Sequence, residues 1–341
     1  MRDRALAVTM GDPAGVGPEI IVKAWQALRA QGPAFLVIGD FDLLKSAATG
    51  GGVTLRRIAA PDDALSVFAN ALPVLDIPLQ GPVVAGRPSP AHAQAVIRWI
   101  ETGAGLSLSG AVSGLVTAPI AKAPLYEAGF QFPGHTEYLG ELTRPQDGRN
   151  SGGPVMMLAA PGLRTTLVTI HEPLSAVPQL LSTDRIVAVA TITAEALTRD
   201  FGLSNPRLAM AALNPHAGEG GALGREELEI IGPASVELRR MGIDCTNPAP
   251  SDSLFHPDAR RTYDAAVCMY HDQALIPVKM LDFWGGVNIT LGLPIVRSSP
   301  DHGVGYDIAG RGLARPDSLI AALRVAAEIA DRRADFATTR G

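Results

Sequence analysis

The sequence is short of several kinds of residue, and each shortage argues against a class of protein. Aromatic residues make up 5% of the 341 residues, and no run of Lys and Arg exceeds two. Nucleic-acid-binding proteins normally show a basic stripe or aromatic stacking residues, so we expect no nucleic-acid partner. Gly, Pro or a charged residue interrupts every long apolar stretch, so we expect no membrane-spanning helix.

Cysteine is equally scarce. Cys245 and Cys268 are too few for a disulfide framework, and their spacing does not match a metal-binding motif. The N-terminal region has only a short apolar run, Ala5–Val8, before Asp12, whereas a signal peptide needs a longer apolar region and a cleavage site. These features predict a cytoplasmic protein.

Apolar residues are plentiful, at 47%, against 18% charged residues and a formal net charge of −5. This balance is typical of a chain that buries a core, and it excludes an intrinsically disordered one. The length suits two domains of roughly 100–200 residues each.

Short aliphatic runs alternate with longer segments of helical character. Most runs are nearly all apolar, which is typical of strands covered on both faces. The expected strands are Ala5–Thr9, Phe35–Gly39, Val74–Ile77, Ala111–Thr117, Val155–Ala159, Arg164–Ile170, Leu208–Leu213 and Ala265–Tyr270. The expected helices are Pro18–Ala30, Ser89–Thr102, Thr183–Phe201 and Asp317–Asp331. This alternation predicts an α/β fold built largely on parallel strands with right-handed crossovers.

Two segments are candidate domain boundaries. Arg144–Gly153 is polar and rich in Gly, which is typical of a linker, and a second break falls near Leu281–Val287, where two glycines adjoin.

Three of the seven histidines follow strand-like apolar runs. His171 follows Arg164–Ile170, His216 follows Leu208–Pro215, and His271 follows Ala265–Tyr270. Ligands of open α/β sheets bind at the carboxyl ends of the strands, so three imidazoles there could converge on one divalent metal. The alternative is that each His caps a strand and bonds to a loop carbonyl.

Asp272 directly follows the third of these histidines. It could be a further metal ligand, a group that orients the imidazole, a proton acceptor, or an ordinary turn residue.

Two glycine-rich segments follow expected strands. Asn214–Gly224 precedes a helical pattern that begins at Arg225, and Gly11–Glu19 precedes a helix that begins at Pro18. Glycines at a helix start suit anion binding, but neither segment has the GxGxxG spacing or the lysine of a phosphate loop. A tight turn leading into a helix explains the first segment equally well.

Two more sets of polar residues stand out. Pro133–Glu137 presents an imidazole, a hydroxyl and a carboxylate next to a glycine, either as a binding loop or as a helix start capped by Thr136. Lys279, Asn288 and Arg297 lie among apolar residues, where a cation needs a partner such as a substrate phosphate or a structural carboxylate.

At these positions the sequence resembles the 4-hydroxythreonine-4-phosphate dehydrogenase family of vitamin B6 biosynthesis. The matching stretches extend over almost the whole chain: GDPAGVGPE (11–19), TAPIAK (117–122), PGHTEYL (133–139), LNPHAGEGG (213–221), MYHDQALIPVK (269–279) and GVNITLGLPIVRSS (286–299).

The resemblance implies a two-domain fold like that of isocitrate and isopropylmalate dehydrogenases, with mostly parallel sheets and no standard Rossmann fingerprint. It implies a discontinuous nucleotide-binding domain of residues 1–143 plus 286–341, and a metal, substrate and dimerisation domain of residues 144–285. It also implies a homodimer with the active site at the subunit interface.

The resemblance assigns roles to individual residues. It implies a divalent metal, Zn²⁺, Mg²⁺ or Co²⁺, on His171, His216 and His271, and NAD or NADP near His302, Gly303 and Asp307. The implied substrate-binding residues are His135, Thr136, Lys279, Asn288 and Arg297. We expect Lys279 and Arg297, with Asn288, to bind the phosphate, and His135 and Thr136 to orient the other end. The candidates for proton transfer are Asp272, Asp252 and Lys122, which the sequence does not rank.

The implied reaction is metal-assisted oxidation of 4-phosphohydroxy-L-threonine to 2-amino-3-oxo-4-phosphonooxybutanoate, which decarboxylates to 3-amino-2-oxopropyl phosphate. As a Lewis acid, the metal would lower the pKa of the substrate hydroxyl. Three alternatives stay open: a relative that oxidises another phosphorylated hydroxy acid or a dihydrodiol carboxylate, a zinc lyase or hydrolase that uses no nucleotide, and a non-catalytic metal- or nucleotide-binding protein.

Overall fold

A computed structural model describes residues 4–49, 51–144 and 153–340. The chain forms two compact units, one of residues 1–149 and 293–331 and the other of residues 150–292 and 332–341. The domain boundaries implied by the family resemblance, 143/144 and 285/286, each lie a few residues before the boundaries of these units. The resemblance also assigned the last ten residues to the first unit. The expected linker Arg144–Gly153 lies mostly outside the described residues.

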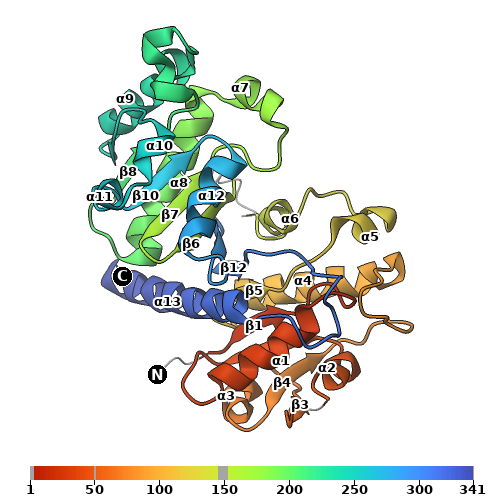
Figure 1. The fold of residues 1–341 in the computed structure, drawn as a ribbon. Coiled ribbons are helices and arrows are strands. Elements are labelled where there is room, and N and C mark those ends of the chain that lie inside the picture. Colours follow the sequence, from red (N-terminus) through yellow and green to blue (C-terminus); the bar gives the residue numbers. More distant parts are fainter. Residues whose placement is uncertain (1–3, 50, 145–152, 341) are drawn as a thin grey trace. The chain divides into compact units, whose positions relative to one another are not determined.

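The first unit is built on a parallel sheet (Figure 1). The described strands follow the order β3 (Leu55–Arg57), β4 (Leu72–Asp76), β2 (Phe35–Gly39), β1 (Leu6–Thr9), β5 (Leu115–Thr117) and β12 (Arg297–Pro300). Every pairing among them is parallel. The helices of this unit are α1 (Gly17–Leu28), α2 (Phe41–Ala47), α3 (Asp63–Phe68), α4 (Ala93–Leu108), α5 (Lys122–Glu127), α6 (His135–Leu142) and the first part of α13 (Asp317–Arg340), with a short 3₁₀ turn, η1 (Pro90–His92).

Two tryptophans anchor helices of the first unit in its core. Trp25 of α1 and Trp99 of α4 are almost fully buried, and their indole N–H groups donate to the carbonyl oxygens of Phe68 (2.9 Å) and Ile77 (2.9 Å). A buried indole needs such a partner for its single donor. These bonds hold α1 against the end of α3, and α4 against the residue that follows β4.

The second unit has a mixed sheet. Its described strands follow the order β11 (Val287–Leu291), β6 (Val155–Ala160), β7 (Leu163–Leu167), β10 (Ala265–Cys268), β8 (Arg207–Met210) and β9 (Asp244–Cys245). Strand β6 is antiparallel to both of its neighbours, β11 and β7, and β7, β10, β8 and β9 are parallel. The helices are α7 (Val177–Leu180), α8 (Thr183–Phe201), α9 (Gly232–Arg240), α10 (Ser251–Leu254), α11 (Pro257–Arg260) and α12 (His271–Leu281), with shorter turns η2 (Leu174–Ala176), η3 (Pro215–Gly221) and η4 (Glu227–Ile231).

Helices α8 and α12 cover opposite faces of this sheet. Thr165 of β7 donates to Ala274 of α12 (3.3 Å), and Thr166 accepts from Thr193 of α8 (3.2 Å). Neighbouring residues of a strand point to opposite faces, so each helix packs on its own side. The α12 side buries an apolar cluster that includes Leu158, Leu167 and Val278.

The α/β class with mostly parallel strands, predicted from the sequence, is confirmed. Helix Thr183–Phe201 and strand Phe35–Gly39 have the predicted bounds. The side chain of Ser182 caps the N-terminus of α8, and Gly202 ends it in the left-handed conformation, as such positions favour.

Several predicted bounds were wrong. The strand predicted from Ala111 begins at Leu115, and the strands predicted to reach Ile170 and Leu213 end at Leu167 and Met210. Ser89 caps the short turn η1 instead of opening a long helix, and the helix that follows runs from Ala93 to Leu108. The helical pattern expected from Arg225 begins with a π-helical turn, η4. Strands β3, β9, β11 and β12 were not predicted.

Cys245 and Cys268 are free and buried. None of the described helices combines the length and apolar composition needed to cross a lipid bilayer.

Candidate active site

The strands that precede the three predicted metal ligands lie side by side. In the second unit, β10 pairs in parallel with β7 on one side and with β8 on the other. Their carboxyl ends therefore meet at one edge of the sheet, which is the edge where α/β proteins bind ligands. His171, His216 and His271 each follow one of these strand ends.

Two of the three imidazoles lie close together. Backbone pairing continues past the strand ends, because Thr169 N–H donates to the Met269 carbonyl oxygen (3.2 Å) and the Thr169 hydroxyl donates to the same oxygen (2.6 Å). The rings of His171 and His271 follow at once, with centroids 5.7 Å apart.

Asp272 orients one of these rings. Its Oδ1 lies 2.8 Å from Nδ1 of His271, and its carboxylate is otherwise exposed. A carboxylate on one ring nitrogen fixes the tautomer and strengthens the other nitrogen as a metal donor. Of the roles left open for Asp272, this contact favours that of the orienting group.

Gln273 ties this strand end to its neighbours. It is 6% exposed; its Oε1 accepts from Met269 N–H (2.6 Å), and its Nε2 donates to the Ala212 carbonyl oxygen (2.6 Å) and to the Ser251 hydroxyl (2.7 Å). This residue was not predicted from the sequence, although it lies inside the matched stretch MYHDQALIPVK. Gln273 therefore helps to set where α12 begins, and with it the position of His271.

His216 takes a different path. Pairing with β10 stops two residues after the end of β8, because Ala212 N–H donates to the Ala249 carbonyl oxygen (2.9 Å). His216 then lies in the turn η3 with left-handed backbone angles (φ 52°, ψ 30°). Among the described residues, no three His, Cys, Asp or Glu side chains form a group that could hold a metal ion. One chain thus brings His171 and His271 together without His216, and the metal site stays a prediction.

The first unit contains a buried cationic site. Arg297 is 3% exposed and donates to the Thr117 hydroxyl (2.7 Å). Burial lowers the pKa of Arg297 to about 10, although the charge of Glu137 acts in the opposite direction. Burial, and then the charge of Arg297, lower the pKa of His135 well below its ordinary value, so its imidazole is neutral at pH 7.

His135 offers an unsatisfied polar atom at this site. Its Nε2 is buried and has no hydrogen-bond partner among the described residues. A buried polar atom of this kind costs free energy unless a ligand or a water satisfies it. The sequence assigned His135 and Arg297 to opposite ends of the substrate, whereas the electrostatic effect of Arg297 on His135 makes them neighbours.

The loop that carries His135 is anchored from behind. Helix α6 begins at His135 without a side-chain cap, so the alternative in which Thr136 caps the helix was wrong. The ring of Tyr138 packs against the rings of Phe130 and Phe132, with a centroid distance of 4.9 Å to each. The Tyr138 hydroxyl donates to the Glu101 carboxylate (2.8 Å). Half-buried Lys122 lies beside the same loop, with Cε 3.7 Å from where a Cβ on Gly134 would be.

Three more residues predicted to bind the substrate or transfer its proton belong to the second unit. Lys279 of α12 lies over the ring of Phe283, 5.2 Å from its centroid. Asn288 of β11 is half-buried, and its Oδ1 has no hydrogen-bond partner within the described part of the chain. Asp252 is exposed on α10.

The loop that contains the predicted nucleotide-binding residues His302, Gly303 and Asp307 is hydrogen-bonded at one end to the glycine-rich loop after β1. The Tyr306 hydroxyl donates to Asp12 Oδ2 (2.6 Å), and Asp12 Oδ1 accepts from Ala14 N–H (2.9 Å). Val16 N–H donates to the Val304 carbonyl oxygen (2.9 Å).

Helix α1 fastens the other end of this loop. Lys23 donates to the carbonyl oxygens of Gly312 (2.8 Å) and Ala314 (2.7 Å), and Glu19 accepts from Ala314 N–H (3.0 Å).

The loop leaves its predicted nucleotide-binding residues accessible. His302 and Asp307 are exposed, and a Cβ added to Gly303 would meet nothing within 4 Å. A fastened loop with exposed polar groups and open space suits a bound nucleotide.

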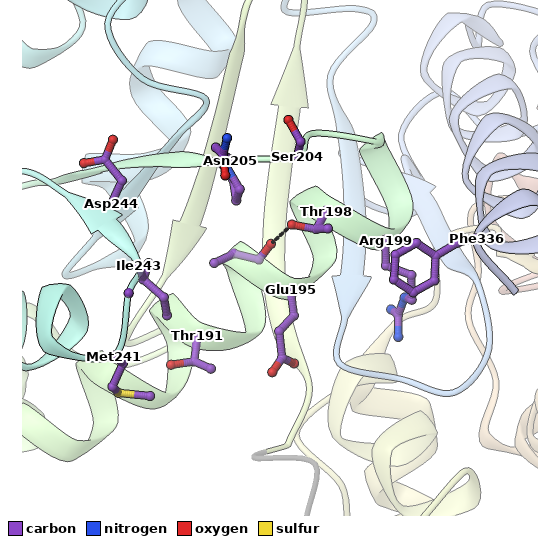
Figure 2. Close-up of a pocket in the computed structure, with 13 residues that line it drawn as sticks. Thr191, Glu195, Thr198, Arg199, Ser204, Asn205, Met241, Ile243, Asp244 and Phe336 are labelled. Atoms are coloured by element: carbon purple, nitrogen blue, oxygen red, sulfur yellow. Dashed lines mark hydrogen bonds between the residues drawn. The ribbon is translucent and has the colours of Figure 1, made fainter. Parts of the chain in front are cut away.

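A separate cavity of about 880 Å³ lies in the second unit (Figure 2). Its lining includes Thr191, Glu195 and Thr198 of α8, together with Asp244 and Phe336. Pro206, which precedes β8, and Asp244, which begins β9, place it at the amino-terminal ends of these strands. It lies at the edge opposite to the three histidines and contains none of the predicted site residues.

Known proteins resemble this chain over nearly its whole length. A 4-hydroxythreonine-4-phosphate dehydrogenase of Caulobacter vibrioides is 68% identical over 333 residues, which are 98% of this chain and 99% of that protein. The crystal structure of the enzyme of the same name from Klebsiella pneumoniae is 37% identical, with a TM-score of 0.83 over 96% of this chain and 99% of that one.

A more distant structure is the terephthalate 1,2-cis-dihydrodiol dehydrogenase of Burkholderia xenovorans. It is 27% identical, with a TM-score of 0.63 over 96% of this chain and 98% of that one. A family model described as pyridoxal phosphate biosynthetic protein PdxA matches residues 31–326. The chain therefore belongs to the PdxA family of pyridoxal phosphate biosynthetic proteins.

Proposed function

We propose that this protein is a 4-hydroxythreonine-4-phosphate dehydrogenase of pyridoxal phosphate biosynthesis. Membership of the PdxA family and a relative of that name at 68% identity support the proposal. The substrate would be 4-phosphohydroxy-L-threonine, whose secondary alcohol loses a hydride and a proton. The product, 2-amino-3-oxo-4-phosphonooxybutanoate, is a 3-oxo acid and loses CO₂ to give 3-amino-2-oxopropyl phosphate.

The observation that carries the proposal is the buried pair of Arg297 and His135. A guanidinium in a desolvated site gains stability when a phosphate or carboxylate binds to it, and its planar donors suit both groups. Neutral His135 has a buried Nε2 ready for a further hydrogen bond. Both features suit a small anionic substrate, with Thr136 on the same loop as a further contact.

Lys279 and Asn288 are further residues that we propose for substrate binding. Lys279 and Asn288 would contribute a cation and an amide, and fixing both ends of the substrate would direct its C–H bond toward the nucleotide. NAD or NADP, bound near His302, Gly303 and Asp307, would accept the hydride.

The donor set of the second unit suits a divalent metal. The pair of His171 and His271, with Asp272 on one ring nitrogen, supplies imidazoles oriented as metal ligands normally are. Zn²⁺, Mg²⁺ or Co²⁺ on these two residues and His216 would act as a Lewis acid that lowers the pKa of the substrate hydroxyl.

The hydroxyl proton needs an acceptor. Since Asp272 is engaged with His271, Lys122 and Asp252 are the better candidates. Of the two, Lys122 lies beside the loop that carries His135.

We further propose that the active enzyme is a homodimer. Helix α12 and the residues after it expose a set of large apolar side chains: Ile276 (60%), Met280 (81%), Phe283 (61%) and Trp284 (52%). We call these four the α12 patch. Monomeric proteins seldom leave such a patch open, and Phe283 contacts the predicted substrate residue Lys279. A second copy on this patch would also explain why one chain does not assemble all three histidines.

The test is a spectroscopic assay of the purified protein with 4-phosphohydroxy-L-threonine, NAD or NADP, and each metal in turn. We expect NADH or NADPH to form, and chelation to abolish the reaction. Arg297→Gln should raise KM for this substrate about 10- to 100-fold, since a charge-assisted bond contributes about 1.5–3 kcal/mol. Arg57→Gln, which removes an exposed arginine paired with Asp76, is the control and should leave KM unchanged.

Absence of reduced nucleotide under all of these conditions would contradict the dehydrogenase. The same assay with a cis-dihydrodiol carboxylate tests the activity named for the Burkholderia xenovorans relative. Turnover of that compound, but not of the phosphorylated amino acid, would favour the alternative.

A further inference from the structure

The turn that carries His216 is costly to form. Six successive residues, from His216 to Gly221, have positive φ angles, and three of them are not glycine: His216 (52°), Ala217 (51°) and Glu219 (44°). The left-handed conformation costs roughly 1–2 kcal/mol for each residue with a Cβ. Such a turn persists only where its surroundings hold it, and strain of this kind concentrates at functional sites.

A buried carboxylate holds the entrance to this turn. Glu227, the first residue of η4, is 6% exposed. Its Oε1 accepts from the backbone N–H groups of Leu213 and Asn214, both at 2.8 Å, and its Oε2 accepts from Asn214 Nδ2 at 3.0 Å. Leu213 and Asn214 immediately precede Pro215 and His216.

The same carboxylate packs against the turn itself. A Cβ added to Gly218 would lie 2.7 Å from Glu227 Oε2 and 2.8 Å from the Gly224 carbonyl oxygen. By contrast, a Cβ added to Gly220 would meet nothing within 4 Å, although its φ is also positive (63°). The turn therefore touches Glu227 at Gly218 and is open at Gly220.

Glu227 is ionised where it binds the turn. Burial alone would raise its pKa, but the hydrogen bonds from Asn214 and from backbone N–H groups have the larger combined effect, and the pKa lies below the ordinary value. An ionised carboxylate forms stronger bonds to N–H groups than a neutral amide does.

The π-helical turn η4 sets the position of this carboxylate. Gly232 makes room for the wider turn, because a Cβ there would lie 2.6 Å from the Glu227 carbonyl oxygen. Single π-helical turns occur often at functional sites.

We propose that Glu227 is a positioning residue that holds the left-handed turn and thereby presents the His216 imidazole to the metal. The part that concerns the metal rests on the function proposed above. The part that concerns the turn does not.

Two measurements separate these parts. The first is amide hydrogen exchange of residues 216–221 in the metal-free, full-length protein with Glu227→Gln. A glutamine of nearly the same size has one acceptor oxygen for the donors of Leu213 and Asn214, so we expect exchange in this turn to rise at least about tenfold, with the rest of the second unit unchanged. Glu229→Gln, which changes an exposed glutamate paired with Arg225, is the matched control and should have no effect.

The second measurement is Co²⁺ affinity by titration. Loss of a group that orients a metal ligand typically weakens binding about 10- to 100-fold, and we expect that loss for Glu227→Gln. In a His216→Ala background the same substitution should have no additional effect, because its action passes through His216.

The glycines give an independent pair of variants, which serves if Glu227→Gln fails to fold. Gly218→Ala pushes on the Glu227 carboxylate, whereas Gly220→Ala adds the same methyl group at positive φ without a contact. We expect Gly218→Ala to reproduce both effects of Glu227→Gln and to exceed Gly220→Ala in each.

The outcomes are distinct. Unchanged exchange in residues 216–221, or an equal rise throughout the second unit, would overturn the positioning role. Raised exchange in the turn alone, with no Co²⁺ binding even by the unsubstituted protein, would uphold Glu227 as the residue that holds the turn and would contradict the proposed metal.

Discussion

At the scale of single residues, the candidate site depends on which buried group keeps its proton. Arg297 and His135 are both desolvated and close enough for the charge of one to affect the other. Two buried cations would repel each other, so one group must be neutral. Arginine retains its proton even with a pKa of about 10, and the imidazole therefore loses its own.

This arrangement predicts an unusual titration of His135. We expect its ring proton resonances to stay constant between pH 8 and pH 6 in NMR spectra, because burial and Arg297 hold its pKa well below the ordinary value. In Arg297→Gln the pKa should rise only in part, since burial is the larger cause. A midpoint near 6.5 in the unsubstituted protein would contradict the assignment.

The same shift has a consequence for stability. The unfolded chain protonates this histidine near pH 6.5, before the folded chain does, so the folded state binds fewer protons below that pH. His135 therefore lowers the free energy of unfolding as the pH falls below about 6.5, and the effect levels off once the folded ring is protonated.

The sequence predicted part of this cluster. Arg297 stood out as a cation among apolar residues, and His135 stood out beside Gly134. Thr117 did not, because its bond to Arg297 joins positions 180 residues apart, and a single threonine at the end of a strand carries no signal of such a partner. Glu227 escaped notice for the same reason: its role follows from the bonds to Leu213 and Asn214, which the chain makes only after it has folded.

At the scale of elements, close approach of backbones positions the predicted nucleotide loop. Gly17, within the glycine-rich segment 11–19, begins α1, and a Cβ there would collide with the Met10 carbonyl oxygen. Met10 is fully buried at the end of β1, so its backbone has little room to move. The helix can lie this close to the strand end only because residue 17 is glycine.

Gly17→Ala should therefore destabilise the protein by about 1–3 kcal/mol in urea unfolding, which is the usual cost of overpacking. It should also weaken NAD binding, because the loop before α1 must shift. Gly105→Ala is the matched control, since Gly105 is an exposed helical glycine whose added Cβ meets nothing within 4 Å. There we expect a gain of about 0.4–1 kcal/mol. Equal effects of the two substitutions would contradict the close approach at Gly17.

Elements were predictable where apolar pattern and burial agree. Strands such as β1 and β2 are continuous apolar runs and are fully buried. Strand β12 was missed because its residues are polar and yet buried, with Ser298 donating to the Ala322 carbonyl oxygen (2.9 Å) and Arg297 donating to Thr117. Its hydrogen bonds, and not its hydropathy, compensate for burial.

At the scale of the whole molecule, the C-terminal helix shows why the boundary of the last element was wrong. The apolar periodicity of α13 ends near Asp331, and the sequence ended the helix there. In the structure the helix continues to Arg340, and residues 332–341 belong to the second unit. Arg333 bonds to buried Asp200 of α8 (2.8 and 2.9 Å), which Arg199 also contacts. An ion pair therefore anchors the segment that lacks an apolar face.

The exposed surface of the second unit gives the last prediction, the oligomeric state. Stable protein interfaces bury about 1,200–2,000 Å² and have apolar centres, and the α12 patch supplies four large apolar side chains that solvent would otherwise cover. We expect sedimentation velocity to give twice the mass of the 35.6 kDa chain, and Met280→Asp to shift the protein toward the monomer and remove its activity together. A buried aspartate would carry an unpaired charge into the interface.

Leu65→Asp, at an apolar residue exposed on α3 of the first unit, is the control and should leave both properties unchanged. Because Lys279 contacts Phe283 of the patch, a monomeric unsubstituted protein with full activity would contradict both the dimer and the placement of the active site beside it.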